Sequence, residues 1–311
     1  MQAATISSAF LRLVGDAPNV IAQQRGYFKE VGIDFTLVPF DGGSKAMPSL
    51  STGQIDILPA TADVNFFNAV ARGIQLRIGA DDSTLAPGHD IYGMAVRKEL
   101  VDSGRYKSPK DFKGMKVAVS SLTGSLYYIV ALLAQKNGFT LKDMDISALA
   151  FADALVALKQ GGIDAANLVE PFTSRSETEG FAKVTLRSLD ISPDIPGAHL
   201  MMSPQFVQKG DVAVRFYTAW LRGLRDYLTE FVNGKNSDQM VKLLQANQIA
   251  IVPTAQNPTF DPDGKVPVKP VKDLFQFFKD LGQIQGNVDP DSTFDQSFVT
   301  KAAQQLGPYK P

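Results

Sequence analysis

A turn rich in hydroxyl groups is the strongest candidate for ligand chemistry in this chain. The stretch SSLTGS at residues 120–125 lies between an apolar segment typical of a strand and one typical of a helix. Side-chain hydroxyls and unpaired backbone N–H groups at the positive end of a helix favour an anion. We therefore expect Ser121, Thr123, Gly124 and Ser125 to bind a carboxylate, sulfonate or phosphate group. Ordinary helix capping by Thr123 or Ser125 is the structural alternative.

Two polar residues at the end of another apolar segment are expected near this turn. Asn167 and Glu170 close the stretch 163–170 and are followed by Pro171. The Glu170 carboxylate could accept hydrogen bonds from an amine or hydroxyl of a ligand. Alternatively, Glu170 faces solvent and pairs with Arg175. Together with the donor-rich turn, Glu170 favours a ligand that has both an acidic end and a donor end.

Three further loops follow strand-like segments and precede helix starts. In open parallel α/β sheets, ligands bind beyond the carboxyl ends of the strands, where helix N-termini point outward. The loops at residues 12–16, 41–44 and 60–63 fit this description. From them, the expected ligand-binding residues are Arg12, Asp16, Gly43, Ser44, Thr61, Ala62 and Asp63.

The remaining chemically interesting residues do not indicate catalysis. Neither His89 nor His199 has metal-ligand spacing; His199 could donate to a bound anion or be a structural histidine with its hydrogen bonds satisfied. Trp220 lies in a helical pattern and is expected in the core. Cysteine is absent, and we find no lysine-terminated phosphate loop, glycine-flanked nucleophilic serine or carboxylate pair. We therefore expect a binding protein without metal or cofactor.

Alternating strand and helix signals predict two α/β lobes, each with a mainly parallel sheet flanked by helices. The chain is long enough for two cores of roughly 100 to 150 residues. We expect lobe 1 to comprise residues 1–94 and 199–311, and lobe 2 residues 95–198. The predicted strands are 6–13, 33–38, 55–60, 74–78, 116–120, 146–149 and 163–169. The predicted helices start at Asp16, Ser44 (as a cap), Asp63, Gly124, Ala152, Pro171 and Val212 and lie near Met240, Leu274 and Phe298, with a loop at 253–270.

A repeated phrase supports two equivalent lobes. Residues 50–56 and 158–164 share the pattern Leu-x-x-Gly-x-Ile-Asp. Each copy is typical of a helix-to-strand junction, with glycine in the left-handed cap position and the carboxylate at a solvated strand edge. Convergence of two ordinary junctions is the alternative.

Charge and hydropathy limit the partners. Lysine and arginine total 31 against 32 acidic residues, so no strong field attracts nucleic acid or an anionic membrane. No apolar run approaches the roughly 20 residues that a membrane-spanning helix needs. The opening Met1-Gln2-Ala3-Ala4 leads at once into a strand, which fits an exported chain trimmed of its signal peptide; a cytoplasmic protein with a short tail is the alternative.

Several phrases resemble the nitrate, sulfonate and taurine-type periplasmic binding proteins. They are Ala17-Pro18 with Ile21-Ala22, then RGYFKEVGID at residues 25–34, Gly42-Gly43-Ser44, residues 50–57, DFKGMKVAV at 111–119 and residues 161–171. The resemblance covers roughly the first two thirds of the chain.

This resemblance implies a two-lobed type II periplasmic-binding-protein fold with a central ligand cleft. It also implies a periplasmic, monomeric component of an ABC importer, which closes over a small solute and delivers it to a membrane permease. The family's ligand loops would fall on residues 12–16, 43–44, 61–63, 123–126 and 167–170. Many sulfonate and nitrate relatives carry a bulky aromatic residue near the position of Pro171; Glu170 here argues against a simple inorganic anion.

An enzyme of the same superfamily is the alternative function. A pyrimidine-forming enzyme of thiamine biosynthesis shares the fold, but it depends on a cysteine-rich motif that this chain lacks. A metal-free lyase or transferase of a cofactor pathway, using the same cleft, stays open.

Overall fold

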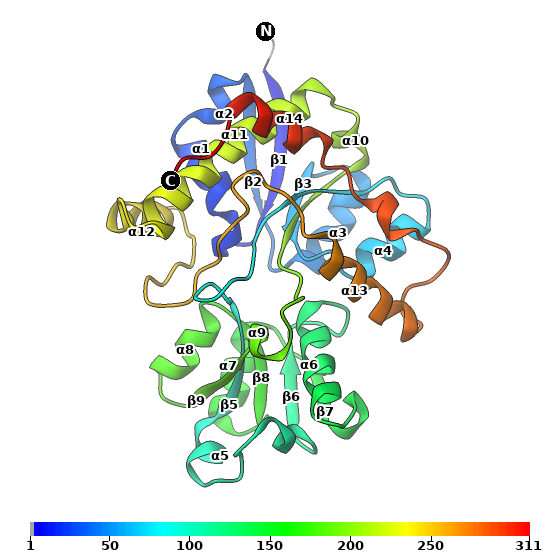
Figure 1. The fold of residues 1–311 in the computed structure, drawn as a ribbon, viewed down its shortest axis with the longest axis vertical. Helices are drawn as coiled ribbons and strands as arrows, with labels where there is room; N and C mark the ends of the chain where they lie inside the picture. Colours follow the sequence, from blue (N-terminus) through cyan, green and yellow to red (C-terminus); the bar gives the residue numbers. More distant parts are fainter. Residues whose placement is uncertain (1–2) are drawn as a thin grey trace. The chain divides into compact units, whose positions relative to one another are not determined.

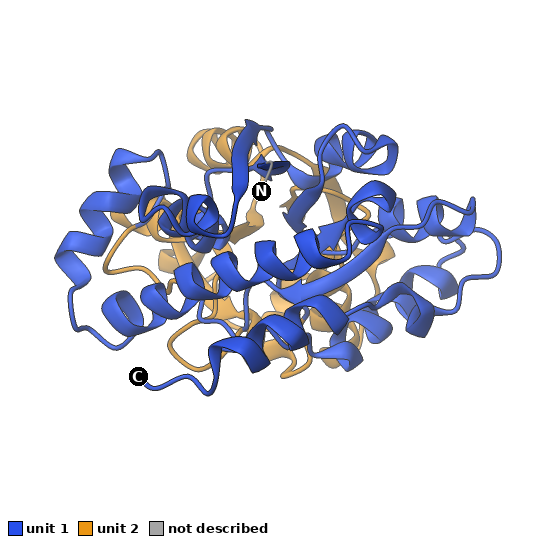
Figure 2. Cartoon of the chain, turned by 90° about the horizontal axis from the view of Figure 1, so that it is seen from above, with its two compact units in different colours: residues 1–84, 196–251, 258–311 blue, residues 85–195, 252–257 orange. Residues whose placement is uncertain are grey.

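The computed structural model describes residues 3–311 and contains two compact units (Figure 2). The first unit holds residues 1–84, 196–251 and 258–311, and the second holds residues 85–195 and 252–257. The lobe boundaries expected after residues 94 and 198 stay a prediction. The expected trimmed start falls on Met1 and Gln2, which lie outside the described residues.

The first unit is built on a mainly parallel five-stranded sheet (Figure 1). Its strands are β1 (Ala4–Phe10), β2 (Ile33–Pro39), β3 (Ile57–Ala60), β4 (Arg77–Asp81) and β10 (His199–Met202). They lie in the order β2-β1-β3-β10-β4, and only β10 runs antiparallel to its neighbours among the described strands of this sheet. The carboxyl ends of β1, β2 and β3 therefore meet at one edge of the sheet.

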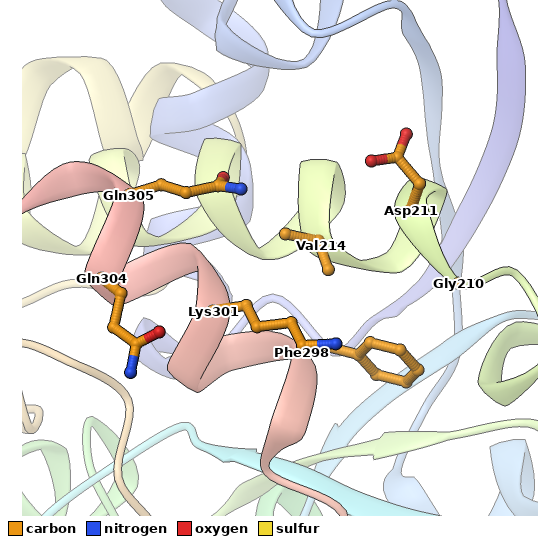
Figure 3. A pocket seen from close by; sticks show the side chains of 7 residues that line it. All are labelled: Gly210, Asp211, Val214, Phe298, Lys301, Gln304 and Gln305. Carbon is orange, nitrogen blue, oxygen red and sulfur yellow. The ribbon is translucent and has the colours of Figure 1, made fainter.

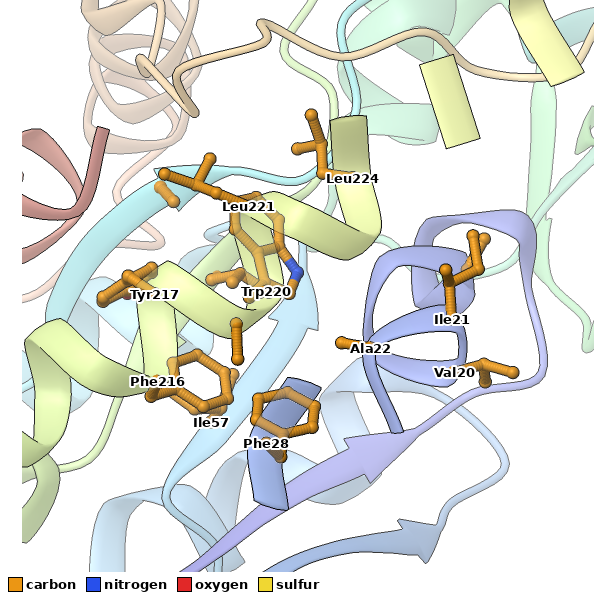
Figure 4. Packing of buried hydrophobic residues seen from close by; sticks show 14 of the residues in the cluster. Val20, Ile21, Ala22, Phe28, Ile57, Phe216, Tyr217, Trp220, Leu221 and Leu224 are labelled. Carbon is orange, nitrogen blue, oxygen red and sulfur yellow. The ribbon is translucent and has the colours of Figure 1, made fainter. Parts of the chain in front are cut away.

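Helices flank this sheet (Figure 1). They are α1 (Ala17–Gln24), α2 (Tyr27–Glu30), α3 (Gly43–Thr52), α4 (Val64–Ala71), α10 (Pro204–Val207), α11 (Asp211–Tyr227), α12 (Ser237–Ala246), α13 (Val268–Asp280) and α14 (Ser297–Leu306). The long helix α11 continues into a π-helical turn, Leu228–Val232. Its apolar face packs against α1 (Figure 4), and Trp220 is fully buried there, so the prediction of Trp220 as a core residue is confirmed.

The second unit has a sheet of the same kind. Its strands are β5 (Tyr92–Arg97), β6 (Lys116–Val119), β7 (Asp145–Ala148), β8 (Ala165–Val169) and β9 (Ala182–Arg187), and its helices are α5 (Lys98–Asp102), α6 (Ser125–Lys136), α7 (Phe151–Gln160), α8 (Phe172–Thr178) and α9 (Ser188–Ile191). The order is β7-β6-β8-β5-β9, with β5 antiparallel to both neighbours. The predicted α/β class with mainly parallel sheets is confirmed. Within residues 3–311, no helix is long and apolar enough to cross a bilayer.

Some predicted boundaries were wrong. β1 ends at Phe10 and not at residue 13, because the backbone turns into the 3-10 helix Val14–Asp16. β4 begins at Arg77 and not at residue 74, since the N–H of Ile74 still bonds the carbonyl of Ala69 at the end of α4. The loop predicted to reach residue 270 ends earlier, where α13 begins at Val268.

The repeated phrase marks equivalent junctions in the two units. Gly53 and Gly161 end α3 and α7 with φ of +73° and +76°. The prediction that the carboxylates after these glycines stay at a solvated strand edge was wrong, because both accept hydrogen bonds from the backbone. Asp56 Oδ2 accepts a hydrogen bond from the Ser7 N–H at 2.9 Å, and Asp164 Oδ2 accepts one from the Lys116 N–H at 3.0 Å. Each carboxylate thus joins its junction to the neighbouring parallel strand.

Candidate functional site

In the first unit, the loops after β2 and β3 are joined by a hydrogen bond. Ser44 was predicted to cap α3, but α3 begins at Gly43 with Gly42 as its N-cap residue, and the Ser44 hydroxyl instead donates to Asp63 Oδ2 at 3.2 Å. Asp63 caps α4 as predicted, accepting from the N–H groups of Asn65 and Phe66. The carboxylate of Asp63 is buried, and burial raises its pKa above the usual value.

Close backbone packing holds the same loops together. A Cβ atom at Gly43 would lie 2.7 Å from the Ala60 Cβ, so the start of α3 reaches the end of β3 only because residue 43 is glycine. The Thr61 hydroxyl donates to the Gly197 carbonyl at 3.1 Å, and Ala62 is fully buried. The structure therefore brings the predicted residues of these two loops to one place.

The loop after β1 is organised by Asp16. Its Oδ2 accepts hydrogen bonds from the N–H groups of Leu11 at 3.0 Å and Leu13 at 3.2 Å, on either side of Arg12. Asp16 is only 1% exposed, and burial raises the pKa of its carboxyl group from 3.8 to about 7. Asp16 Oδ1 has no hydrogen-bond partner among the described residues.

Two further buried carboxyl groups, which the sequence analysis missed, lie at the end of β4. Asp81 and Asp82 are 0% and 1% exposed. Burial raises the pKa of Asp81 to about 7, while burial together with the nearby Asp16 and Asp81 raises that of Asp82 well above its usual range. Neither carboxyl oxygen of Asp82 has a partner within residues 3–311. The Asp-Asp doublet after an apolar strand is the sequence feature that could have revealed these two carboxyl groups. The strand predicted at residues 74–78 ended before this doublet.

His199 lies at the start of β10, opposite Ala60 on one side and Asp81 on the other. It is fully buried, and in the described part of the chain neither ring nitrogen has a hydrogen-bond partner, so it is not the satisfied structural histidine of the alternative interpretation. Burial lowers the pKa of His199 to about 4. A neutral imidazole can still donate one N–H to an acceptor.

In the second unit, the hydroxyl-rich turn leads into α6. The hydroxyls of Ser121 and Thr123 bond each other at 2.7 Å, and the Thr123 N–H donates to Ser121 Oγ at 3.2 Å. Gly124 is the N-cap residue, and no side chain of residues 3–311 caps the helix there. The capping alternative for Thr123 and Ser125 is therefore wrong, and the first N–H groups of α6 keep their capacity to bind an anion.

Asn167 connects the end of β8 to this turn. Its Nδ2 donates to the Leu126 carbonyl, in the first turn of α6, at 3.0 Å. Asn167 is 1% exposed, and its Oδ1 has no partner within the described chain. The second unit thus places a buried acceptor beside the donor-rich turn.

Glu170 is buried and already engaged. Its Oε1 pairs with Arg187 Nη1 at 2.8 Å, and its Oε2 accepts from the Ser174 N–H at 3.0 Å. The alternative of a solvent-facing pair with Arg175 was wrong, because Glu170 is 4% exposed and Arg175 bonds Glu179. Nothing in the sequence pattern near residue 170 indicated Arg187, which comes from β9.

One surface pocket lies elsewhere. It has a volume of about 560 Å³ and lies in the first unit between the start of α11 and α14 (Figure 3). Its lining residues are Gly210, Asp211, Val214, Phe298, Lys301, Gln304 and Gln305. It contains none of the predicted ligand residues, so we assign the candidate site to the strand-end loops. Among residues 3–311, no group of three or more His, Cys, Asp or Glu is arranged to hold a metal ion.

Solved structures with the same fold include solute-binding proteins and an enzyme. The periplasmic nitrate-binding protein NrtA from Synechocystis PCC 6803 has a TM-score of 0.79 at 14% identity, covering 98% of this chain and 89% of that one. The periplasmic aliphatic sulphonate-binding protein SsuA from Escherichia coli has a TM-score of 0.75 at 19% identity, covering 96% and 99%. The desulfurization enzyme DSZB has a TM-score of 0.65 at 13% identity, covering 98% and 100%.

Sequence comparison gives one curated relative and a family. An Escherichia coli (strain K12) protein, named as a candidate aliphatic sulfonates-binding protein, is 28% identical over 156 residues, which are 50% of this chain and 46% of the relative. The match thus spans about half the length of that relative. The model of the NMT1-like family matches residues 2–245, well over half of the chain. The chain belongs to the NMT1-like family.

Proposed function

We propose that this protein is the solute-capturing component of an ABC importer and binds a small organic anion or zwitterion. The observation that carries the proposal is the start of α6, where hydroxyl groups gather around a helix N-terminus that no described side chain caps. The names of its relatives, which describe binding of sulfonates or nitrate, support the same class of ligand. The partners would be the solute and a membrane permease, and the location the periplasm.

The ligand residues we propose are those expected from the sequence. They are Arg12, Asp16, Gly43, Ser44, Thr61, Ala62, Asp63, Ser121, Thr123, Gly124, Ser125, Asn167, Glu170 and His199. Because the second unit presents the unpaired Asn167 Oδ1 acceptor as well as the hydroxyl-rich turn, a ligand with an acidic end and a donor end fits better than nitrate. Hinge closure on the ligand and a monomeric state stay predictions.

A ligand screen tests the proposal. Purified protein would be heated with alkanesulfonates, carboxylates, nitrate, amino acids and pyrimidines in turn. A ligand at 100-fold its dissociation constant stabilises a protein by about 2.7 kcal/mol, which gives a clear rise in Tm. Mass spectrometry of the denatured protein identifies any solute that was purified with it. Recovery of a chemically converted product would instead support the alternative enzyme.

Ser125→Asp should weaken binding of an anionic ligand by about tenfold or more. Ser125 is the first residue of α6, so an added carboxylate would compete with the ligand for the same N–H groups. The fold should tolerate the change, because a carboxylate at a helix N-terminus is favourable. Calorimetric titration with the identified ligand measures the effect, and Ser125→Ala, which adds no charge, is the control. Equal affinity in Ser125→Asp and wild type would remove the turn from the site.

A further inference from the structure

Two residues with unusual backbone geometry contact each other at the carboxyl end of β1. Arg12 has a φ of +61° and Gln248 a φ of +65°, and they are the two non-glycine residues with positive φ in the described chain. Residues other than glycine adopt this left-handed region at a cost in free energy, and such strain gathers at functional sites. The pair is joined by a hydrogen bond from Arg12 Nε to Gln248 Oε1, at 3.2 Å.

Three anchors hold Arg12 in this conformation. The Asp16 carboxylate accepts from the N–H groups of Leu11 and Leu13, which flank Arg12 in the chain. The Ala250 N–H donates to the Arg12 carbonyl at 3.0 Å. Gln248 holds the guanidinium itself. Hydrogen bonds therefore fix the backbone of Arg12 on both sides. A strained conformation persists in a folded protein when the surrounding contacts hold it in this way.

The terminal nitrogens of Arg12 are left for another partner. Its guanidinium lies 5.7 Å from the centroid of the Phe10 ring and bonds Gln248 through Nε. The Asp16 carboxylate acts on it through charge, but no contact short enough for an ion pair is found for Arg12 within residues 3–311. The side chain is partly exposed. A guanidinium fixed through Nε presents its two Nη atoms as a planar fork, which matches the two oxygens of a carboxylate or sulfonate.

We propose that Arg12 binds the oxyanion end of the solute and that Gln248 is the residue that positions it. The inference rests on the proposed function and deepens it, because it assigns a specific role, oxyanion binding, to one of the ligand residues proposed above. The family match ends at residue 245, and Gln248 lies beyond it. The hydrogen bond that positions the Arg12 guanidinium therefore comes from a residue outside the matched part of the chain.

Substitution by glycine tests whether the positive φ of Arg12 and Gln248 serves ligand binding or the stability of the fold. Arg12→Gly and Gln248→Gly each remove a side chain and relieve the positive φ, so the ligand-free Tm should stay unchanged or rise. Arg105→Gly is the matched control, since it removes an exposed loop arginine whose φ is not positive, and its Tm should fall. A ligand-free Tm for Arg12→Gly or Gln248→Gly that falls further than that of Arg105→Gly would overturn the proposal.

Binding of methanesulfonate and benzoate, measured by titration, is the second readout. We expect Arg12→Gly to weaken at least one of them by about tenfold or more, and Gln248→Gly by about threefold. Gln248→Asn, whose shorter amide tolerates the left-handed region but should not reach Arg12, should match Gln248→Gly. Wild-type affinity in Arg12→Gly would overturn the proposal.

The outcome also distinguishes this inference from the proposed function. If the wild-type protein bound neither probe but bound a solute without an oxyanion group, the role of Arg12 would be wrong and solute capture would stand. If it bound no solute of any class while the glycine variants kept their Tm, the proposed function would fail as well.

Discussion

Asp82→Asn should make the protein more stable at about pH 8, by roughly 2 to 4 kcal/mol in the free energy of unfolding. Asp82 is 1% exposed and has no hydrogen-bond partner for either oxygen in the part of the chain that the structure describes. Folding at this pH must therefore bury a charge or take up a proton, and both cost free energy. An amide of the same size removes that cost, and its N–H could donate to the unpaired Oδ1 of Asp16.

The same substitution should reduce the pH dependence of stability. Burial raises the pKa of Asp16 and of Asp81 from 3.8 to about 7, and that of Asp82 well above 3.8. A carboxyl group with a raised pKa contributes stability that is fully present below the unfolded value of 3.8 and is lost as the pH rises through the folded value. Wild-type stability should therefore rise as the pH falls from about 8 to about 6.5.

His199 acts in the opposite direction at lower pH. Burial lowers its pKa from 6.5 to about 4, so its contribution is present above 6.5 and is lost as the pH falls through about 4. The carboxyl effect is therefore cleanest above about pH 6.5.

Denaturant unfolding across this pH range measures both effects. Asp34→Asn, which alters an exposed carboxylate on β2, is the control and should leave the pH profile unchanged. If Asp82→Asn were as stable as wild type, or less stable, throughout the range, the Asp82 carboxyl group would not be buried without hydrogen-bond partners as the structure has it.

Gly223→Ala should destabilise the protein by about 3 kcal/mol. A Cβ atom at Gly223 would lie 2.3 Å from the Pro18 carbonyl oxygen and 3.0 Å from the Ala22 nitrogen, both backbone atoms of α1. Figure 4 shows Ala22 on the side of α1 that faces α11. Because backbone atoms of a packed helix cannot rotate away, α1 and α11 would have to separate.

The expected sign is informative, because intrinsic propensity favours the opposite outcome. Alanine is preferred over glycine inside a helix by about 1 kcal/mol. The matched control is Gly162→Ala, where a Cβ would meet its nearest atom at 3.6 Å, an ordinary contact. Thermal unfolding of both variants tests the contact: a Tm at or above wild type for Gly223→Ala would mean that the two helices are not packed as closely as the structure has them.

The order of most helices and strands was predictable from the residues themselves. Gly53, Gly161 and Asp63 act within one turn of their own helices, through a left-handed φ or a hydrogen bond to the next N–H groups. Such signals need only residues a few positions apart. For the same reason, the residue pattern alone was enough to select the loops after β1, β2 and β3 as ligand candidates.

The strands that run antiparallel were not predictable in this way. β10 has four residues, and its place between β3 and β4 depends on pairing with segments far away in the chain. Short apolar runs give no directional signal, because the residue pattern of a buried strand is the same in either direction.

Residue types and local spacing thus sufficed to predict the fold class and the strand-to-helix turn at residues 120–125. The sequence itself contains no cysteine and so excludes cysteine chemistry. The partners of the site residues came only from tertiary structure. Arg12 bonds a residue 236 positions away, and Glu170 pairs with Arg187 and not with Arg175. The Asp81-Asp82 doublet is visible in the sequence, but the burial that raises the pKa of Asp82 is decided by the tertiary structure. Hydrogen bonding, burial and charge interactions depend on distance in space, and only folding brings these residues together.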